Sequence, residues 1–188
     1  MKKFELTSEF ITNISGTKLF RIKALVEFGN IKAGELGGYI EKEENLDQDG
    51  DAWVYGDAEV WGNAKVCGDA KVYGDAKVYG NAWVYGDAKV CGNAEVCGNA
   101  RVCGNAEVCG NAKVCGNADY AYAHGFGSEY RTTTFFRLRN GDVGVRCGCF
   151  YGTLQEFRDK VRATHKETKK AKEYLMLADL MELRFAKE

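Results

Sequence analysis

A six-residue repeat fills residues 51–116 and constrains the fold more than any other feature of this sequence. Eleven units follow one another without an insertion, each reading Asn or Asp, Ala, a variable residue, Val, a second variable residue and Gly. In an extended strand the Ala and Val side chains point to one face and the variable residues to the other. Gly followed by Asn or Asp tolerates the left-handed backbone of a sharp corner. Because strands this short cannot bury an apolar face alone, the repeat predicts a solenoid of stacked copies.

The Val-x-Gly-(Asn/Asp)-Ala-x pattern resembles that of the hexapeptide-repeat family of left-handed parallel β-helices. The resemblance implies three strands per coil, so that residues three units apart stack vertically at roughly 4.8 Å, the spacing of paired strands. We therefore predict a mainly β protein, a left-handed parallel β-helix of almost four coils. A β-hairpin would cap its N-terminal end and a ββαα module its C-terminal end.

The segments on either side of the repeat divide the chain into three predicted parts. These are an N-terminal β cap over residues 1–36, the β-helix over 37–122 and a C-terminal module over 123–188. Residues 4–28 alternate in the manner of a hairpin, which would cover the apolar end of the first coil. The Gly-Gly-Tyr-Ile-Glu segment at 37–41 resembles one in a bacterial subgroup of the hexapeptide family that is assigned to transferases.

The C-terminal module is predicted from turn and helix signals. Asn-Gly at 140–141 is the strongest short hairpin signal, and pairing about it places Phe136 opposite Val145. Thr-Leu-Gln-Glu at 153–156 is a capping box that opens a helix, and a last helix is expected over about residues 169–185. The Arg-Cys-Gly-Cys-Phe run before the capping box resembles a segment of uncharacterised bacteriophage proteins, which implies a phage origin.

The predicted hairpin carries the candidate ligand site. Arg131, Thr133, Phe135 and Arg137 alternate along one strand, and the predicted pairing adds Arg146 to their face. Guanidinium groups match phosphate geometry and Phe135 would stack on a planar base. This face therefore predicts contact with an anionic or nucleotide-like ligand. The alternative is that the same face packs on the end of the β-helix or on a second subunit.

Charge and composition bear on the partners and the compartment. The net charge is −1, but residues 129–188 hold 13 basic and 9 acidic side chains, which favours an anionic partner at that end. The sequence has no long apolar run and no signal-peptide core after Met1. We therefore expect a cytoplasmic protein without membrane contact, in the host cytoplasm if the protein is viral.

The cysteines indicate packing rather than a disulfide framework. Six of the eight occupy the repeat position after Val, where Tyr and Trp also occur: Cys67, Cys91, Cys97, Cys103, Cys109 and Cys115. A reducing compartment would keep them as free thiols. Stacked pairs offer two sulfur ligands and no third or fourth, so no metal site is predicted. Cys147 and Cys149 are expected in the core of the hairpin.

Outward aromatic residues on the repeat predict a subunit interface. They are Trp53, Tyr55, Trp61, Tyr73 and Tyr79, and they form a flat apolar wall. Such walls more often mark contacts between subunits than small-molecule pockets. We expect a homo-oligomer, and trimers are common in the hexapeptide family.

Three classes of function stay open. The favoured one is a non-catalytic binding protein of phage origin, without a cofactor. Its rigid β-helix would present the basic C-terminal face or a subunit junction, which binds or sequesters a nucleotide-like ligand or a host protein. The alternative is an acyltransferase that uses acetyl-CoA, as the family resemblance implies. The repeat contains no His, so His124, just past the last coil, would be the general base. The third is a purely structural oligomeric spacer.

Overall fold

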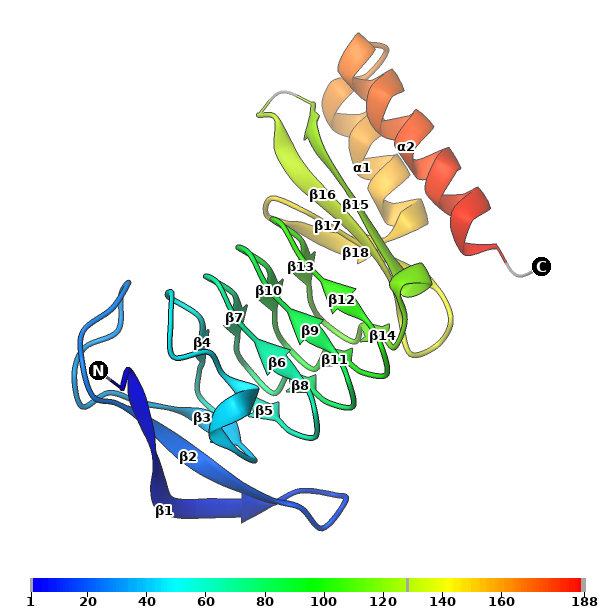
Figure 1. Ribbon diagram of the computed structural model, residues 1–188. Coiled ribbons are helices and arrows are strands. Elements are labelled where there is room, and N and C mark those ends of the chain that lie inside the picture. The colour runs from blue at the N-terminus through cyan, green and yellow to red at the C-terminus, as the bar shows by residue number, and fades with distance from the viewer. Residues whose placement is uncertain (1, 128, 187–188) are drawn as a thin grey trace.

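The structure, a computed structural model, describes residues 2–127 and 129–186. It shows a parallel β-solenoid of about four turns between two caps, an N-terminal one of strands and a C-terminal one of strands and helices (Figure 1). The predicted fold class is confirmed. Within the described residues, no helix has the length and apolar character that a membrane crossing requires.

Each repeat unit contributes one two-residue strand to the solenoid. The strands are β4 (Trp53–Val54), β5 (Glu59–Val60), β6 (Lys65–Val66), β7 (Lys71–Val72), β8 (Lys77–Val78), β9 (Trp83–Val84), β10 (Lys89–Val90), β11 (Glu95–Val96), β12 (Arg101–Val102), β13 (Glu107–Val108) and β14 (Lys113–Val114). They stack in parallel as β4-β7-β10-β13, β5-β8-β11-β14 and β6-β9-β12. Lys71 pairs with Lys89 and Lys89 with Glu107, which confirms the predicted period of three units.

The corners of the solenoid depend on Gly and Asn. Gly80 has a φ of +74°, and a Cβ atom there would lie 3.0 Å from the backbone nitrogen of Gly98, one coil away. Only glycine fits both the backbone angle and the close approach. Asn63 Nδ2 donates to Asn81 Oδ1 at 3.1 Å, and Asn81 Nδ2 donates to Asn99 Oδ1 at 3.1 Å. Stacked side-chain amides thus tie successive coils together along this edge.

The N-terminal cap extends one wall of the solenoid. Strands β1 (Phe4–Thr12) and β2 (Lys18–Ala24) form the predicted hairpin, and β2 pairs antiparallel with β3 (Leu36–Ile40). Strand β3 then pairs in parallel with β5, so the sheet runs β1-β2-β3-β5-β8-β11-β14. A 3₁₀ turn at Glu43–Asn45 leads into the regular coils.

Trp53 does not lie on an outward wall, and its prediction as an interface residue is wrong in this respect. Its side chain is 0% exposed. The rings of Phe28 and Phe4 pack edge-on against it, with centroids at 5.3 Å and 6.2 Å. The residues between β2 and β3 cover the outer side of the first coil, where the sequence pattern alone indicates solvent.

The C-terminal cap is a sheet layered between the solenoid and two helices (Figure 1). A 3₁₀ turn at Asn117–Asp119 leads into β15 (Tyr120–Phe126), β16 (Arg131–Arg137), β17 (Val143–Cys147), β18 (Phe150–Thr153), α1 (Leu154–His165) and α2 (Lys169–Phe185). The strands pair antiparallel in chain order. Thr153 and Glu156 form the predicted capping box at the start of α1, which confirms that prediction.

One pair of cysteines departs from the expectation of free thiols. Cys97 and Cys115 stand one coil apart in the same column, with Cα atoms 4.3 Å apart, and form a disulfide. Stacking of identical repeat positions brings the two sulfurs together. The cysteines that are free thiols in the structure are Cys67, Cys91, Cys103, Cys109, Cys147 and Cys149.

Candidate functional site

The predicted ligand-binding face of the C-terminal hairpin is a buried layer. Phe135 and Thr133 are both 0% exposed. The Phe135 ring packs edge-on against Phe157 of α1, with centroids 6.1 Å apart. The helices therefore cover the face that was predicted to bind a ligand, and Phe135 cannot stack on a base.

Burial of both faces of β16 accounts for this error, and the strand pairing is also shifted by one residue from the prediction. Phe135, rather than Phe136, lies opposite Val145. The backbone nitrogen of Arg139 donates to the carbonyl oxygen of Asn111 in the last coil at 3.1 Å. The backbone nitrogen of Leu138 donates to the carbonyl oxygen of Asp142 at 2.9 Å, so the turn holds three residues, 139–141, in place of the two-residue Asn-Gly turn. A shift of one residue exchanges the two faces of a strand relative to its neighbour.

Arg146 consequently lies on the opposite face from the other predicted ligand-binding residues. Its Nε atom is 3.1 Å from Glu107 Oε1 in the solenoid. Thr134, on the same side of the sheet, accepts a hydrogen bond from the Glu107 backbone nitrogen at 3.0 Å. Arg146 thus fixes the cap to the last coils, which is the packing alternative left open by the sequence.

The two remaining arginines of the predicted site do different things. Arg137 donates to the carbonyl oxygen of Phe185 at 3.1 Å and lies over its ring at 5.3 Å, so it closes the end of α2. Arg131 is exposed and lines a small cavity together with Cys147 and Cys149. The structure therefore does not gather the predicted set into one site.

A basic and aromatic pocket lies elsewhere, where the solenoid meets its C-terminal cap. We call this cavity of 460 Å³ the junction pocket; its lining residues are Tyr85, Arg101, Asn117, Tyr120, Ala121, Tyr122 and Arg184. Segments far apart in the sequence build it, namely the β6-β9-β12 wall, strand β15 and the last turn of α2.

Asn117 links the segments that carry the two arginines. Its side-chain oxygen accepts from the backbone nitrogen of Arg101 at 2.9 Å. Its carbonyl oxygen accepts from Arg184 Nη2 at 3.4 Å. Tyr120 adds a third tie, because its hydroxyl donates to the Arg101 carbonyl oxygen. Burial and a hydrogen bond with the Cys103 thiol raise the pKa of Tyr120, so the hydroxyl keeps its proton at neutral pH.

The guanidinium charges of the junction pocket have no carboxylate partner in the part of the chain that the structure describes. Ion pairs within 4.0 Å join carboxylates to Arg139, Arg146 and Arg158, but not to Arg101 or Arg184. No Asp or Glu stands among the residues that line the pocket. The pocket is therefore positively charged and suited to an anion.

Planar side chains accompany these charges. Trp83 lies between Lys65 and Arg101, with the Lys65 Nζ and Arg101 Cζ atoms 5.4 Å and 5.6 Å from the indole ring. Trp83 and Tyr122 are 39% and 41% exposed, so each offers a ring to a ligand. The phenol of Tyr85 completes the aromatic lining.

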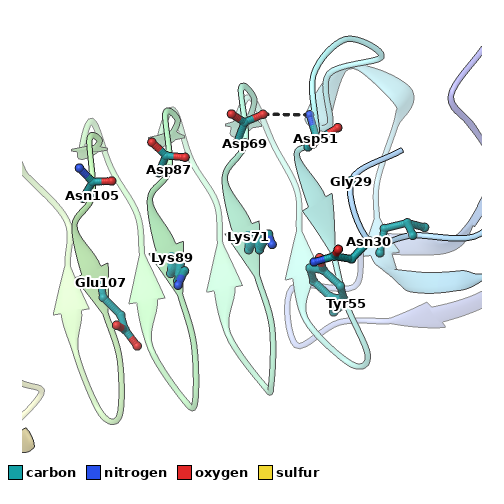
Figure 2. Close-up of a pocket in the computed structure, with 11 residues that line it drawn as sticks. Gly29, Asn30, Asp51, Tyr55, Asp69, Lys71, Asp87, Lys89, Asn105 and Glu107 are labelled. Carbon is teal, nitrogen blue, oxygen red and sulfur yellow. Dashed lines mark hydrogen bonds between the residues drawn. The ribbon is translucent and has the colours of Figure 1, made fainter. Parts of the chain in front are cut away.

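A larger groove of 630 Å³ runs along the β4-β7-β10-β13 wall (Figure 2). Asp51, Asp69 and Asp87 follow one corner, and Lys71 and Lys89 stand on the strands beside them. Asp69 Oδ1 accepts from the backbone nitrogen of Asp51 at 3.2 Å, so this carboxylate stabilises the corner. Because both signs of charge line the groove, it favours neither an anion nor a cation.

Of the remaining predicted residues, Tyr55 lines the groove of the β4-β7-β10-β13 wall. His124 is exposed on β15, with Nδ1 2.9 Å from Thr132 Oγ1, and lines none of the cavities described above. Trp61 stacks on Tyr79 with ring centroids 4.6 Å apart, and Tyr55 and Tyr73 are partly buried against the core. Their roles in catalysis and in subunit contact stay predictions.

A scan against known protein families finds no match to this chain, and a search of curated proteins finds no similar sequence. The chemistry of the site must therefore be argued from its residues.

The junction pocket was not predicted from the sequence, although the repeat places part of its lining on one wall. Arg101 shares a predicted column with Trp83, and Tyr85 stands on the same wall. Tyr122 and Arg184 carry no such signal, because they follow the repeat and reach the pocket only through the packing of the C-terminal cap.

Proposed function

We propose that this protein is a non-catalytic binding protein whose junction pocket takes an anionic ligand with a planar group, such as a nucleotide. The observation that carries the proposal is the pair Arg101 and Arg184, which face one cavity without a carboxylate among its lining residues. The hexapeptide-family relationship and the phage origin that the sequence suggests belong to the same proposal.

The chemistry of the pocket fits such a ligand. The planar forks of Arg101 and Arg184 would hold phosphate oxygens, which guanidinium groups bind in pairs. Tyr122 or Tyr85 would stack on the base. The volume of 460 Å³ falls within the range of roughly 300–1,000 Å³ that small-molecule sites occupy.

Binding rather than turnover follows from what lines the pocket. Its titratable residues are arginines and tyrosines, and Asp, Glu, His and Cys are missing from the lining. General acid–base catalysis near neutral pH relies mostly on those residue types. The pocket is also pre-ordered, because Arg101 stands on a stacked strand and Arg184 is held to Asn117. Such order favours tight binding, as sequestration requires.

The proposal includes a cytoplasmic location, where a nucleotide-like ligand is at hand, and no resident cofactor. It also includes a homo-oligomer in which the stacked Trp61 and Tyr79 lie near the subunit contact. The proposal for the junction pocket does not depend on any of these features.

Calorimetric titration with ADP and GDP tests the proposal. We expect binding to the wild-type chain, and about tenfold weaker binding for each of Arg101→Gln and Arg184→Gln, since each loses a charge-assisted contact worth roughly 1.4 kcal/mol. Arg162→Gln, an exposed arginine of α1 that pairs with Asp159, serves as the matched control and should bind like the wild type.

Equal affinities of the wild type and the double variant would contradict the site, and lack of binding to either nucleotide would contradict the ligand class. Acetyl-CoA tests the acyltransferase alternative in the same samples. That alternative requires acetyl-CoA to raise the melting temperature, whereas we expect no change.

A further inference from the structure

The small cavity lined by Arg131 has a volume of 250 Å³ and lies between the β17–β18 turn and α1, apart from the junction pocket. Its lining includes the thiols of Cys147 and Cys149 and the basic side chains of Arg131, Lys160 and His165. We call it the thiol pocket. Binding of an anion at the junction pocket makes no use of these groups.

The backbone holds the Cα atoms of Cys147 and Cys149 close together. Cys147 pairs with Phe150, which leaves Gly148 and Cys149 as a two-residue turn, with Gly148 at a φ of +57°. Residues two apart are joined by two Cα–Cα steps of roughly 3.8 Å. Bent through a tight turn, these steps bring the Cα atoms of Cys147 and Cys149 within the roughly 4.4–6.8 Å that a disulfide spans.

The two thiols differ in access. Cys149 is exposed at the tip of the turn. Cys147 is partly buried, and its sulfur accepts a hydrogen bond from the Thr133 hydroxyl at 3.2 Å and lies 3.9 Å from the Tyr174 hydroxyl. A reagent from solvent therefore meets Cys149 first, while Cys147 stands behind it in a fixed position.

Positive charge surrounds the pair. A Cβ atom at Gly148 would lie 2.5 Å from Arg131 Nη1, so the glycine makes room for the guanidinium directly against the turn. Lys160 and His165 approach from α1, and no Asp or Glu lines the cavity. Nearby cations raise the local concentration of anions.

We propose that the thiol pocket is a thiol–disulfide exchange site for a small anionic disulfide. The Cys149 thiolate attacks one sulfur of the bound disulfide, forming a mixed disulfide and releasing one small thiolate. The Cys147 thiolate then attacks the Cys149 sulfur and releases the second. The chain is oxidised to a Cys147–Cys149 disulfide, and the small disulfide is reduced to two thiols, which take up the protons that the two cysteines lost.

Oxidised glutathione serves as the anionic probe, and peptide mapping by mass spectrometry follows its products on the full-length chain. We expect a Cys147–Cys149 disulfide in the wild type. Cys147→Ser should accumulate glutathione on Cys149, because the resolving thiol is missing, whereas Cys149→Ser should not accumulate it on Cys147. Glutathione that collects on other cysteines of the Cys147→Ser variant, with Cys149 left unmodified, would overturn the proposal.

A comparison of charges separates a built site from an exposed cysteine. Replacing Arg131 and Lys160 together by Gln should slow the reaction with oxidised glutathione about tenfold. The rate with neutral hydroxyethyl disulfide should change by less than about twofold, since no long-range attraction is lost. Arg162→Gln, which removes a charge from α1 outside the pocket, is the control. Equal slowing of both reagents, or of neither, at an unchanged melting temperature would contradict a role for the cations.

Discussion

The solenoid and the C-terminal cap obey different rules, although both consist mainly of short strands. In the solenoid, every strand pairs with the strand three units away, as in Glu95 with Lys77 and with Lys113. In the cap, the pairing of β16 with β17 is displaced by one residue from what its turn sequence predicts. Repetition determines the first register, and contact with a neighbouring structure determines the second.

The burial patterns of the two regions teach the same lesson. The inward Ala and Val residues of each unit are at most 1% exposed. The other positions turn outward, and among them Trp53 at 0% and Cys91, Cys97 and Cys109 at 4–8% exposure are buried. In β16, four consecutive residues, 133–136, are buried, because the solenoid covers one face and the helices cover the other. Alternation along a strand therefore identifies faces in the solenoid, but it cannot show which face of the cap is free.

The largest expected effect is on the stability of the solenoid and tests its inward-facing positions. Val90→Asp places a carboxylate in a fully buried wall, where it has no partner. We expect a loss of about 4 kcal/mol or more in the free energy of unfolding. Lys89→Gln, one residue away and exposed, should change it by less than about 0.5 kcal/mol. Urea unfolding followed by circular dichroism measures both, and similar losses would contradict the inward and outward assignment.

An intermediate effect tests the burial of both faces of the cap sheet. Phe135→Ala should lower the free energy of unfolding by about 3–5 kcal/mol, because it empties space under α1 and α2. On an exposed ligand face the same change would cost little. Phe10→Ala, at a ring that is 46% exposed, is the matched control with an expected loss below about 1 kcal/mol. Equal and small losses would show that the Phe135 face is free, as the sequence predicted.

The smallest expected effect concerns how the stability of the C-terminal cap depends on pH. Hydrogen bonds from the backbone nitrogen and the hydroxyl of Thr153 lower the pKa of Glu156 below its ordinary value of 4.5. Its contribution to stability is therefore present above that value and is lost as the pH falls through the lower, folded-state pKa. The difference in melting temperature between the wild type and Glu156→Gln should shrink over that range. A constant difference would show that the capping box carries no charge effect.

Part of this structure could be predicted from the sequence alone. The resemblance to the hexapeptide-repeat family implied the coil period, and with that period the spacing of the repeat places Asn63 over Asn81 and Trp83 between Lys65 and Arg101. The capping box and the extent of α2 followed from local signals as well. The burial of Trp53, the opposite face of Arg146 and the arrival of Arg184 beside Arg101 did not. Each of these depends on how a cap lies against the solenoid, and no local pattern encodes that contact.

The junction pocket is the central claim, and arginine side-chain resonances test it most directly. In a nuclear magnetic resonance titration of the isotope-labelled chain with ADP, the Nε–Hε signals of Arg101 and Arg184 should shift together with one apparent affinity. The signal of Arg162 should stay in place. Shifts confined to Arg131 and Arg137, or no arginine shift despite binding, would contradict the account.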